Sequence, residues 1–494
     1  MVPNRVHSLP MTSPQSGSTP QNTFPLTGAA LWLPLALTSL SALMFTLDGS
    51  MNAISLPYIA EEFNTPPAGV VWVSVALQFM ILGLALPVSA LSTSFGRRRL
   101  FTIGVGVFLV GLVGSFFSPD LPTLIASRIV QGVGCALFLS TRNAIAMEVF
   151  PPERRGMALG IIIAAVGLGS ASGPLIGGQL IDVFGWRSIY VTVAPLSLAI
   201  VVLSFILLRR EERQPLVNFD LPGAMLVFVG LGALLVALNR TSAWGAASIG
   251  IIALSAVGVV LMAGFVWREG QAIKPVLELT IFRSAAVVVT SMGLVFQVMG
   301  NSAAILVLPF FLVRSLGLNS TASGALFAIS PAFMIVGGLI GGRLSGRTGV
   351  SPVMVTGMLC QVVGVVMLLL VNEHSGLVHI SSALAIMGMG AGIYQTAAGS
   401  AQMNAVPPGH LGTASALFIG LVMMASSTGG TLGGILMNSS YAAGGALQIS
   451  RVADSYHNVA IAGTVVLAIG MVNALYYHFR IAGRPKVTEA TAPS

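Results

Sequence analysis

Three ionisable side chains, Asp48, Arg128 and Arg142, lie inside long apolar runs of the sequence. A charge at the centre of a lipid bilayer costs roughly 2.5–3.5 kcal/mol on insertion scales, so such a residue indicates a function by default. Burial favours the neutral form of a carboxyl group, whereas a neighbouring guanidinium favours the charged form. We therefore predict that Asp48 takes up and releases a proton as its surroundings, including Arg128, change. The alternative is a buried ion pair that only fixes helix packing.

The segments that carry these residues are predicted to lie in a membrane. Of the 494 residues, 55% are hydrophobic and 8% are charged, and the mean hydropathy is +0.90. Soluble domains carry about 25% charged residues, so this chain has too few to cover a surface in water. Its net charge of +8 arises from short basic clusters between apolar runs rather than from one basic face. Nucleic acid is therefore not an expected partner.

The lengths of the apolar runs predict an all-α polytopic membrane protein, because a helix needs about 20 residues to cross a bilayer. The fourteen predicted spans are 29–57, 68–91, 100–118, 121–146, 157–181, 187–208, 221–239, 247–267, 285–313, 321–343, 352–371, 379–403, 411–437 and 457–480. Most of the 23 Lys and Arg residues fall on one side of these spans. By the positive-inside rule, both termini are expected in the cytoplasm. Glu148 and Asp182 fall at span ends, near water, and need no role inside the membrane.

A repeated turn predicts two related halves. SALSTSFGRRR (89–99) joins the second and third spans, and GGRLSGRTG (341–349) joins the tenth and eleventh. A similar turn in corresponding places is typical of duplicated transporters. The expected organisation is a disordered cytoplasmic tail (1–28), a six-helix half (29–208), a linker with two additional spans (209–284), a second six-helix half (285–480) and a cytoplasmic tail (481–494).

The fifth span contains a ladder of small residues in the stretch GLGSASGPLIGG (167–178). Gly169, Gly173 and Gly177 recur every four residues, so one face of the helix is almost bare backbone. Such a face lets another helix approach closely. Pro174 adds a kink, because one backbone hydrogen bond of the helix is lost there, and Gly178 follows four residues later.

Three of these stretches together resemble the major facilitator superfamily, and within it the fourteen-helix drug:proton antiporters. The first-helix pattern places Asp48, Asn52 and Leu56-Pro57, and SRIVQGVG (127–134) resembles the fourth-helix motif with Arg128 and Gln131. The glycine ladder resembles the fifth-helix antiporter motif, and FGWRSIY (184–190) also resembles the family. The resemblance implies a secondary transporter that alternates access to a midplane cavity between two halves. Candidates for lining that cavity, each of which also suits a simple interhelical hydrogen bond, are Asn52, Gln78, Gln131, Gln297, Asn301, Tyr394 and Gln395.

The turn between the second and third spans departs from the family pattern. The resemblance implies an Asp that latches the cytoplasmic side, but Thr93 stands in its place and Ser94 replaces the first basic residue. Gly96, Arg97 and Arg98 fit the pattern. We expect a weakened cytoplasmic gate, in which Arg97 or Arg98 reaches Glu148 at the water edge.

These features favour proton-driven export of amphipathic or cationic drugs and toxic compounds. The alternatives are an exporter of a lipid or endogenous metabolite without strict proton coupling, and a non-transporting membrane sensor or scaffold. No nucleophile–base pair, phosphate loop or metal-ligand spacing occurs in the sequence, so an enzyme, a cofactor and a metal are not expected. The expected partners are the bilayer, protons and a small-molecule substrate, and the expected form is a monomer in the plasma (cytoplasmic or inner) membrane.

Overall fold

The computed structural model describes residues 29–149, 155–208, 220–244, 248–271, 282, 284–371, 376–405, 411–442 and 449–482, and these ranges are helical apart from short turns. The predicted all-helical fold is confirmed, with fourteen helices of 20 residues or more in the described ranges. Thirteen are long and apolar enough to span a membrane, and α8 adds the shorter apolar stretch Pro222–Leu234.

The N-terminal group of helices contains seven elements. These are α1 (Ala29–Glu62), the short α2 (Pro67–Val70), α3 (Trp72–Phe95), α4 (Arg97–Phe116), α5 (Leu121–Val149), α6 (Arg155–Phe184) and α7 (Ser188–Leu207). A hairpin follows, formed by α8 (Leu221–Trp244) and α9 (Ile249–Glu269). The C-terminal group contains α10 (Ala285–Arg314), α11 (Ser320–Thr348), α12 (Val350–Leu369), α13 (Leu377–Asn404), α14 (Leu411–Ala442) and α15 (Ile449–Tyr476), which ends in a π-helical turn (Tyr477–Ala482).

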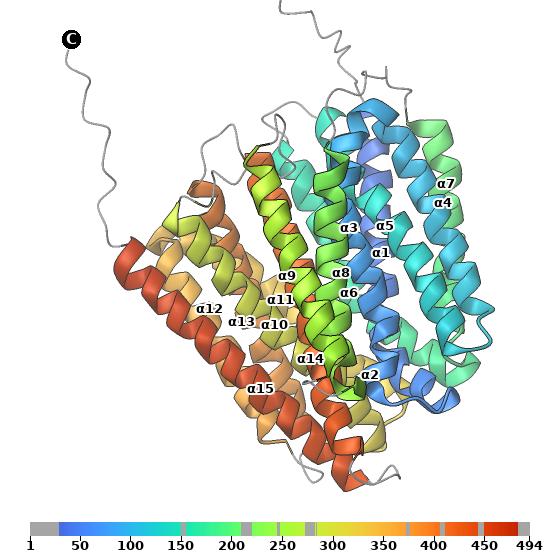
Figure 1. Ribbon diagram of the computed structural model, residues 1–494, viewed down its shortest axis with the longest axis vertical. Coiled ribbons are helices and arrows are strands. Elements are labelled where there is room, and N and C mark those ends of the chain that lie inside the picture. Colours follow the sequence, from blue (N-terminus) through green and yellow to red (C-terminus); the bar gives the residue numbers. More distant parts are fainter. Residues whose placement is uncertain are drawn as a thin grey trace, which may run out of the picture.

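The helix pairs of the N-terminal group recur in the C-terminal group. The packing of α1 on α6, α3 on α5, α4 on α5 and α4 on α7 corresponds to that of α10 on α14, α11 on α13, α12 on α13 and α12 on α15. The two groups meet through α1 with α10, α6 with α11 and α3 with α14. In Figure 1 they converge toward the bottom, where α2 lies. We call this the Glu61 end of the bundle, because α1 ends there, and the opposite side the Arg98 end.

A glycine precedes the third long helix of each group. Gly96 precedes α4 with φ +86°, and Gly349 precedes α12 with φ +87°. A positive φ is unfavourable for residues with a side chain, so glycine suits both turns. Each turn reverses the chain between two long helices, as the repeated sequence pattern indicated.

The contact between α4 and α5 is also repeated, and glycine makes it close. A Cβ atom added to Gly104 would lie 2.7 Å from the backbone nitrogen of Phe138. A Cβ atom added to Gly357 on α12 would lie 2.5 Å from the backbone nitrogen of Tyr394 on α13. Only glycine permits helix axes to approach so closely, so the two pairs are equivalent positions of one internal repeat.

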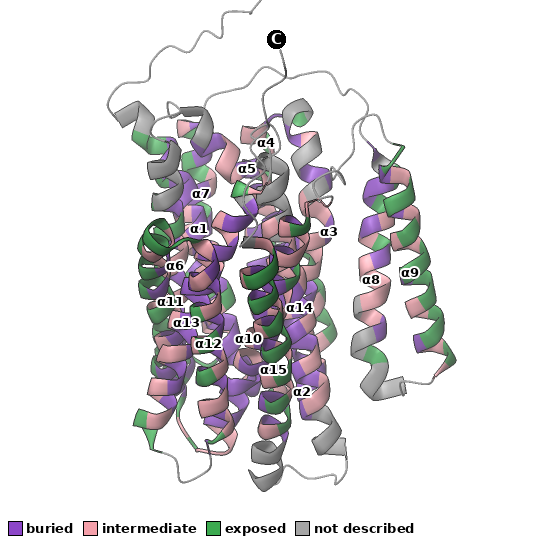
Figure 2. Cartoon of the chain, turned by 90° about the vertical axis from the view of Figure 1, so that its left-hand side faces the viewer, coloured by how far each residue is buried: buried purple, intermediate pink, exposed green. Residues whose placement is uncertain are grey.

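The α8–α9 hairpin stands beside the main bundle (Figure 2). Helix α8 packs on α3 and also on α14. The ring of Phe79 on α3 lies 5.1 Å from the ring of Phe228 on α8. The Phe79 ring also covers Gly232 of α8, and the Phe228 ring covers Gly83 of α3. An ion pair between Asp220 and Arg268 (2.7 Å) joins the start of α8 to the end of α9.

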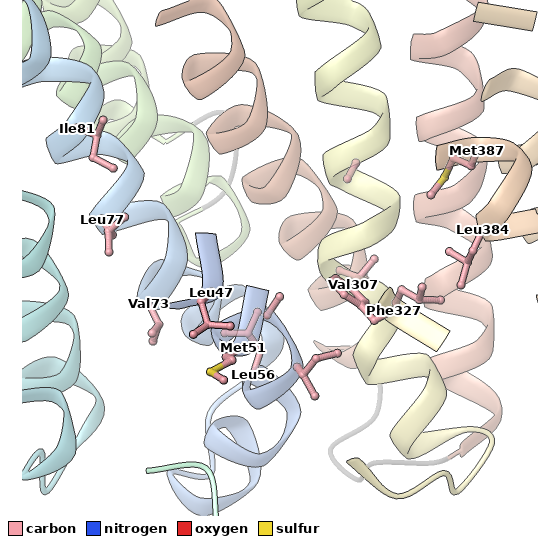
Figure 3. Close-up of a cluster of buried hydrophobic side chains, with 14 of the residues drawn as sticks. Leu47, Met51, Leu56, Val73, Leu77, Ile81, Val307, Phe327, Leu384 and Met387 are labelled. Atoms are coloured by element: carbon pink, nitrogen blue, oxygen red, sulfur yellow. The ribbon is translucent and has the colours of Figure 1, made fainter. Parts of the chain in front are cut away.

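Apolar side chains fill the interior of both groups and also cover the outside. Figure 3 shows buried residues of α1 and α3, among them Met51 and Leu77, and residues of α10, α11 and α13 in one apolar cluster. Val110, Ile163 and Val260 are each more than 60% exposed on the outer faces. A protein with apolar residues on both its inner and outer surfaces is suited to lipid as its solvent.

Candidate functional site

A buried ion pair lies in the middle of the N-terminal group. Asp48 on α1 is 2% exposed and Arg128 on α5 is 1% exposed. The Nη1 atom of Arg128 lies 3.1 Å from one carboxylate oxygen of Asp48 and 3.3 Å from the other. Two of the three ionisable residues that we singled out from the sequence are therefore partners in the fold.

Three further groups hold the Arg128 guanidinium. Its Nε donates a hydrogen bond to the carbonyl oxygen of Val73 on α3 (3.1 Å), and its Nη1 donates to Oε1 of Gln131 (2.5 Å). The guanidinium carbon also lies 5.7 Å from the centre of the Tyr190 ring on α7. Four helices thus fix the orientation of a single arginine, which is how a buried charge is tolerated.

A second set of hydrogen bonds continues from the ion pair along α1. Asn52 lies one turn after Asp48, on the same face of the helix. Its Oδ1 accepts a hydrogen bond from the Tyr190 hydroxyl (3.0 Å), and its Nδ2 donates to Ser74 on α3 (3.0 Å). Asn52 and Gln131, both predicted as cavity residues, therefore belong to one polar network with Asp48.

The Asp48 carboxylate has the Arg128 guanidinium as its counterion. Removing one partner of such a buried pair costs about 3–5 kcal/mol, because the other charge is left unpaired. In the described part of the chain, Nε2 of Gln131 has no hydrogen-bond partner. It is a spare donor beside the ion pair, available when Asp48 or Arg128 moves.

The other predicted cavity residues lie elsewhere. Gln78 lies one turn after Ser74 on α3, and its Oε1 has no partner among the described residues. Gln395 on α13 donates to Gln297 on α10 (3.3 Å), and Asn301 on α10 accepts from Gln361 on α12 (3.3 Å). These amides belong to the C-terminal group and do not contact Asp48. Tyr394 is buried in that group, and its hydroxyl has no partner there.

Several residues of the site escaped the sequence analysis. Ser74 and Tyr190 complete the network around Asn52, and Gln361 is bonded to a predicted residue. Tyr190 ends the stretch FGWRSIY, whose family resemblance was the available signal. Gln361 is an amide inside a predicted span, so the criterion that selected Gln297 applies to it as well.

The small residues of α6 face two different helices. A Cβ atom on Gly169 or on Gly173 would lie 2.6 Å or 3.1 Å from a carbonyl oxygen of α1, and one on Gly177 would lie 3.3 Å from the Cα atom of Met51. Gly178 and Pro174 instead contact α11 of the C-terminal group. A Cβ atom on Gly178 would collide with the Ser320 carbonyl oxygen, and one on Gly324 would collide with the Pro174 carbonyl oxygen. The motif therefore serves packing within one group and closure between the two.

Asp182, at the end of α6, joins the two groups at the Glu61 end. Its carboxylate accepts hydrogen bonds from the backbone nitrogens of Ser320 (2.9 Å) and Thr321 (2.8 Å) and from the Thr321 hydroxyl (2.6 Å). An ion pair between Glu61 on α1 and Arg314 on α10 (2.7 Å) joins the groups nearby. Asp182 lies near the end of its helix, as expected, and the structure adds a role that the sequence analysis did not assign, because a carboxylate is a favourable cap for the free N–H groups at a helix start.

Replacing Asp182 with Ala is expected to weaken closure at the Glu61 end. Each lost bond contributes about 0.5–1.5 kcal/mol when buried and less when exposed, so we expect the open population to be roughly three- to tenfold larger. Double electron–electron resonance between spin labels on the two groups of helices measures this open population. Replacing the neighbouring exposed Val183 with Ala is the control, and an unchanged distance distribution in the Asp182 variant would contradict a closing role.

The turn at the Arg98 end holds the start of α4 against the end of α7. Arg98 donates a hydrogen bond to the Phe205 carbonyl oxygen, and Thr102 is bonded to Ser204 (2.8 Å). The side chains of Thr93, Ser94 and Glu148 lie outside the described residues, as does the predicted contact of Arg97 or Arg98 with Glu148. The weakened gate stays a prediction.

Comparisons with known proteins identify what the chain resembles. A family model described as Major Facilitator Superfamily matches residues 38–418 and 290–493. The chain is 29% identical to Multidrug resistance protein Stp of Mycobacterium tuberculosis (strain CDC 1551 / Oshkosh), over 83% of this chain and 76% of that protein. It is 28% identical to Riboflavin transporter RibZ of Clostridioides difficile (strain 630), over 76% and 82%, and 27% identical to the Tetracenomycin C resistance and export protein of Streptomyces glaucescens, over 86% and 77%.

A solved structure supports the fold alone. A bacterial homolog of the human lysosomal transporter Spinster matches with a TM-score of 0.68 at 15% sequence identity, over 92% of this chain and 98% of that one.

Proposed function

The chain belongs to the Major Facilitator Superfamily, a family of multi-pass membrane transporters and not of enzymes, and on that premise we propose that it exports amphipathic or cationic compounds in exchange for protons. The observation that carries the proposal is the buried pair of Asp48 and Arg128, held by four helices. Asp48 is the one carboxyl group in the described membrane interior of α1 and α3 to α7, at a depth where retaining a charge is costly.

In this mechanism, Asp48 binds a proton and the positive charge of the substrate in turn. A proton on Asp48 removes its charge and frees Arg128 to bond elsewhere, so the pair separates. A cationic substrate favours the ionised carboxylate instead. Because the two occupants compete for one group, each can leave only where the other is available, which couples their movements in opposite directions.

The two groups of helices supply the moving parts. We take residues 29–208 and 285–480 as the two halves, which rock about the contacts between α1 and α10 and between α6 and α11. The described conformation is joined at the Glu61 end by Asp182 and by the pair of Glu61 with Arg314. Opening of those contacts, with closure at the Arg98 end, would turn the site to the other side.

The direction of transport depends on the orientation in the membrane. Arg97, Arg98 and Arg99 lie at the Arg98 end, so we assign this end to the cytoplasm by the positive-inside rule. The Glu61 end then faces outward. The plasma membrane is the proposed location, and one chain contains a complete site, so a monomer suffices.

The relatives support export of foreign compounds. Two of the three curated relatives described above are named for drug resistance or export, and both align along more than four fifths of this chain. A third is named a riboflavin transporter at similar identity. That relative supports a second candidate, the export of an endogenous metabolite without strict proton coupling.

Proteoliposomes distinguish the two candidates. With an imposed pH gradient, a proton-coupled exporter accumulates a fluorescent cation such as ethidium and releases protons when the substrate is added. Uptake that stays the same after the gradient is dissipated would contradict proton coupling and favour the second candidate. Liposomes without protein give the leak rate.

A further inference from the structure

Four amide side chains form a small polar cluster in the C-terminal group. Gln297 and Asn301 lie one turn apart on α10. Gln395 on α13 donates its Nε2 hydrogen to Oε1 of Gln297, and Gln361 on α12 donates its Nε2 hydrogen to Oδ1 of Asn301, each over 3.3 Å. We call these four residues the amide quartet.

Two atoms of the amide quartet lack partners. Gln297 and Gln361 are both fully buried. Within the described part of the protein, Nε2 of Gln297 and Oε1 of Gln361 make no hydrogen bond. Buried polar atoms are almost always bonded in folded proteins, so the cluster presents one unused donor and one unused acceptor. Their partners Asn301 and Gln395 are only half-buried, so the cluster reaches accessible surface.

The amide quartet lies at the depth of Asp48. Glu61 and Arg314 form an ion pair at the ends of α1 and α10, which run in the same direction. Asp48 precedes Glu61 by as many residues as Asn301 precedes Arg314. At about 1.5 Å of rise per residue, both lie ~20 Å from that ion pair. The charged site and the amide quartet therefore occupy the same level in opposite groups.

The positions of the C-terminal group that correspond to Arg128 and Gln131 carry apolar residues. A Cβ atom on Gly111 would lie 2.7 Å from the backbone nitrogen of Gln131, and one on Gly364 would lie 2.6 Å from that of Met387. Met387 is thus the counterpart of Gln131, and Leu384, three residues earlier, is the counterpart of Arg128. Figure 3 shows both Met387 and Leu384 among the buried apolar side chains.

No second charged site occurs at this level of the three helices. In the described parts of α10, α12 and α13, the only Lys, Arg, Asp or Glu is Arg314, at the very end of α10. Uncharged amides carry no net charge, and they bind neutral groups through directional hydrogen bonds. A site built to hydrogen-bond a substrate also discriminates strongly against analogues that lack the bonding group.

We propose that the amide quartet binds an uncharged part of the substrate that carries a hydrogen-bond acceptor beside a donor, such as a hydroxyquinone, a lactam or an amide. This proposal rests on the proposed function. Asp48 then binds the cationic part of a substrate, and the amide quartet in the C-terminal group binds the neutral part. The substrates are then bifunctional molecules, and a cation without a hydrogen-bonding group is a poorer ligand.

Two matched probes test this assignment in equilibrium binding to the full-length protein in nanodiscs, with no gradient. Both carry the same trimethylammonium group, one on a dihydroxyanthraquinone and one on anthracene, which has the same ring shape and no hydrogen-bonding group. Wild-type protein is expected to bind the quinone probe about tenfold more tightly, the scale of one or two neutral hydrogen bonds. Equal binding of the two probes by wild-type protein would overturn the proposal.

Substitutions then locate the preference. Gln297→Met and Gln361→Met, which keep an unbranched side chain of similar size, are expected to remove the tenfold preference and to leave the anthracene probe within twofold. Gln402→Met is the control, because it removes another bond between α13 and α10, from Gln402 to Ser291 (3.2 Å). Equal weakening of both probes by the quartet variants would mean a packing role and would also overturn the proposal.

A different experiment tests the proposed function. Proton-independent flux in proteoliposomes contradicts antiport whatever the binding preference. Because the wild-type comparison of the two probes needs no variant, the outcome for the amide quartet stands even where a substituted chain does not fold.

Discussion

Substrate-induced proton release is expected to fall at least about a hundredfold when Asp48 is replaced with Asn. Asn keeps the shape of the side chain and one acceptor oxygen, but its amide does not take up a proton near neutral pH. The substitution also leaves Arg128 buried without its counterion, a loss of about 3–5 kcal/mol of stability. The measurement is fluorescence of a pH-sensitive dye in inverted vesicles, normalised to the amount of folded protein.

A double variant separates coupling from stability. Asp48→Asn combined with Arg128→Gln removes both buried charges and leaves a neutral amide pair, so stability is expected to recover toward that of the wild-type protein. Proton release is not expected to recover, because no titratable group is restored. If the double variant exchanges protons normally, the ion pair only fixes packing, and the antiport mechanism proposed here is wrong.

Replacing Gly178 or Gly324 with Val is expected to hold the protein open at the Glu61 end and to slow transport on the order of a hundredfold. A side chain at either position would collide with a backbone carbonyl oxygen of the opposite group, and backbone yields far less readily than a side chain. Since the collision occurs between the two groups and not inside one, each group is expected to keep its own fold.

The open state is measurable as a distance between the groups. Spin labels at Phe117 and Val378, which are 73% and 83% exposed, lie on different groups at the Glu61 end. The Gly178 and Gly324 variants should shift this distance to larger values. Gly106→Val on α4 is the matched control, because a Cβ atom there meets nothing within 4 Å. A distance like that of the wild-type protein in both variants would show that closure does not need this contact.

The helices were largely predictable because a membrane helix is specified by length and apolar content alone. The predicted span 187–208 corresponds to α7 (Ser188–Leu207), and the predicted span 221–239 corresponds to α8 (Leu221–Trp244). Helix α1, predicted as 29–57 and observed as Ala29–Glu62, runs five residues past its predicted end, as α8 also does. Pro57 suggested an end, but the helix continues through it, which neighbouring helices in a membrane permit.

The pairing of Asp48 with Arg128 was predictable for a different reason. Each is a rare charge in an apolar run, and such charges normally find each other. Asp182 gave no comparable signal, because an acid at the end of a span resembles any solvated acid. Its partners Ser320 and Thr321 lie on another group of helices, 138 and 139 residues further along the chain. Contacts of this kind depend on which helix faces meet, and residue spacing in one helix does not specify that.

The α8–α9 hairpin has a mechanical consequence. Helix α8 touches α3 in one group and α14 in the other, so it cannot remain fixed to both while they rock. Between α3 and α8, a phenylalanine of each helix packs over a glycine of the other helix. Sliding α8 along α3 would push each ring against the backbone of the facing helix. On the proposed rocking motion, we expect the hairpin to travel with the N-terminal group and α8 to slide along α14.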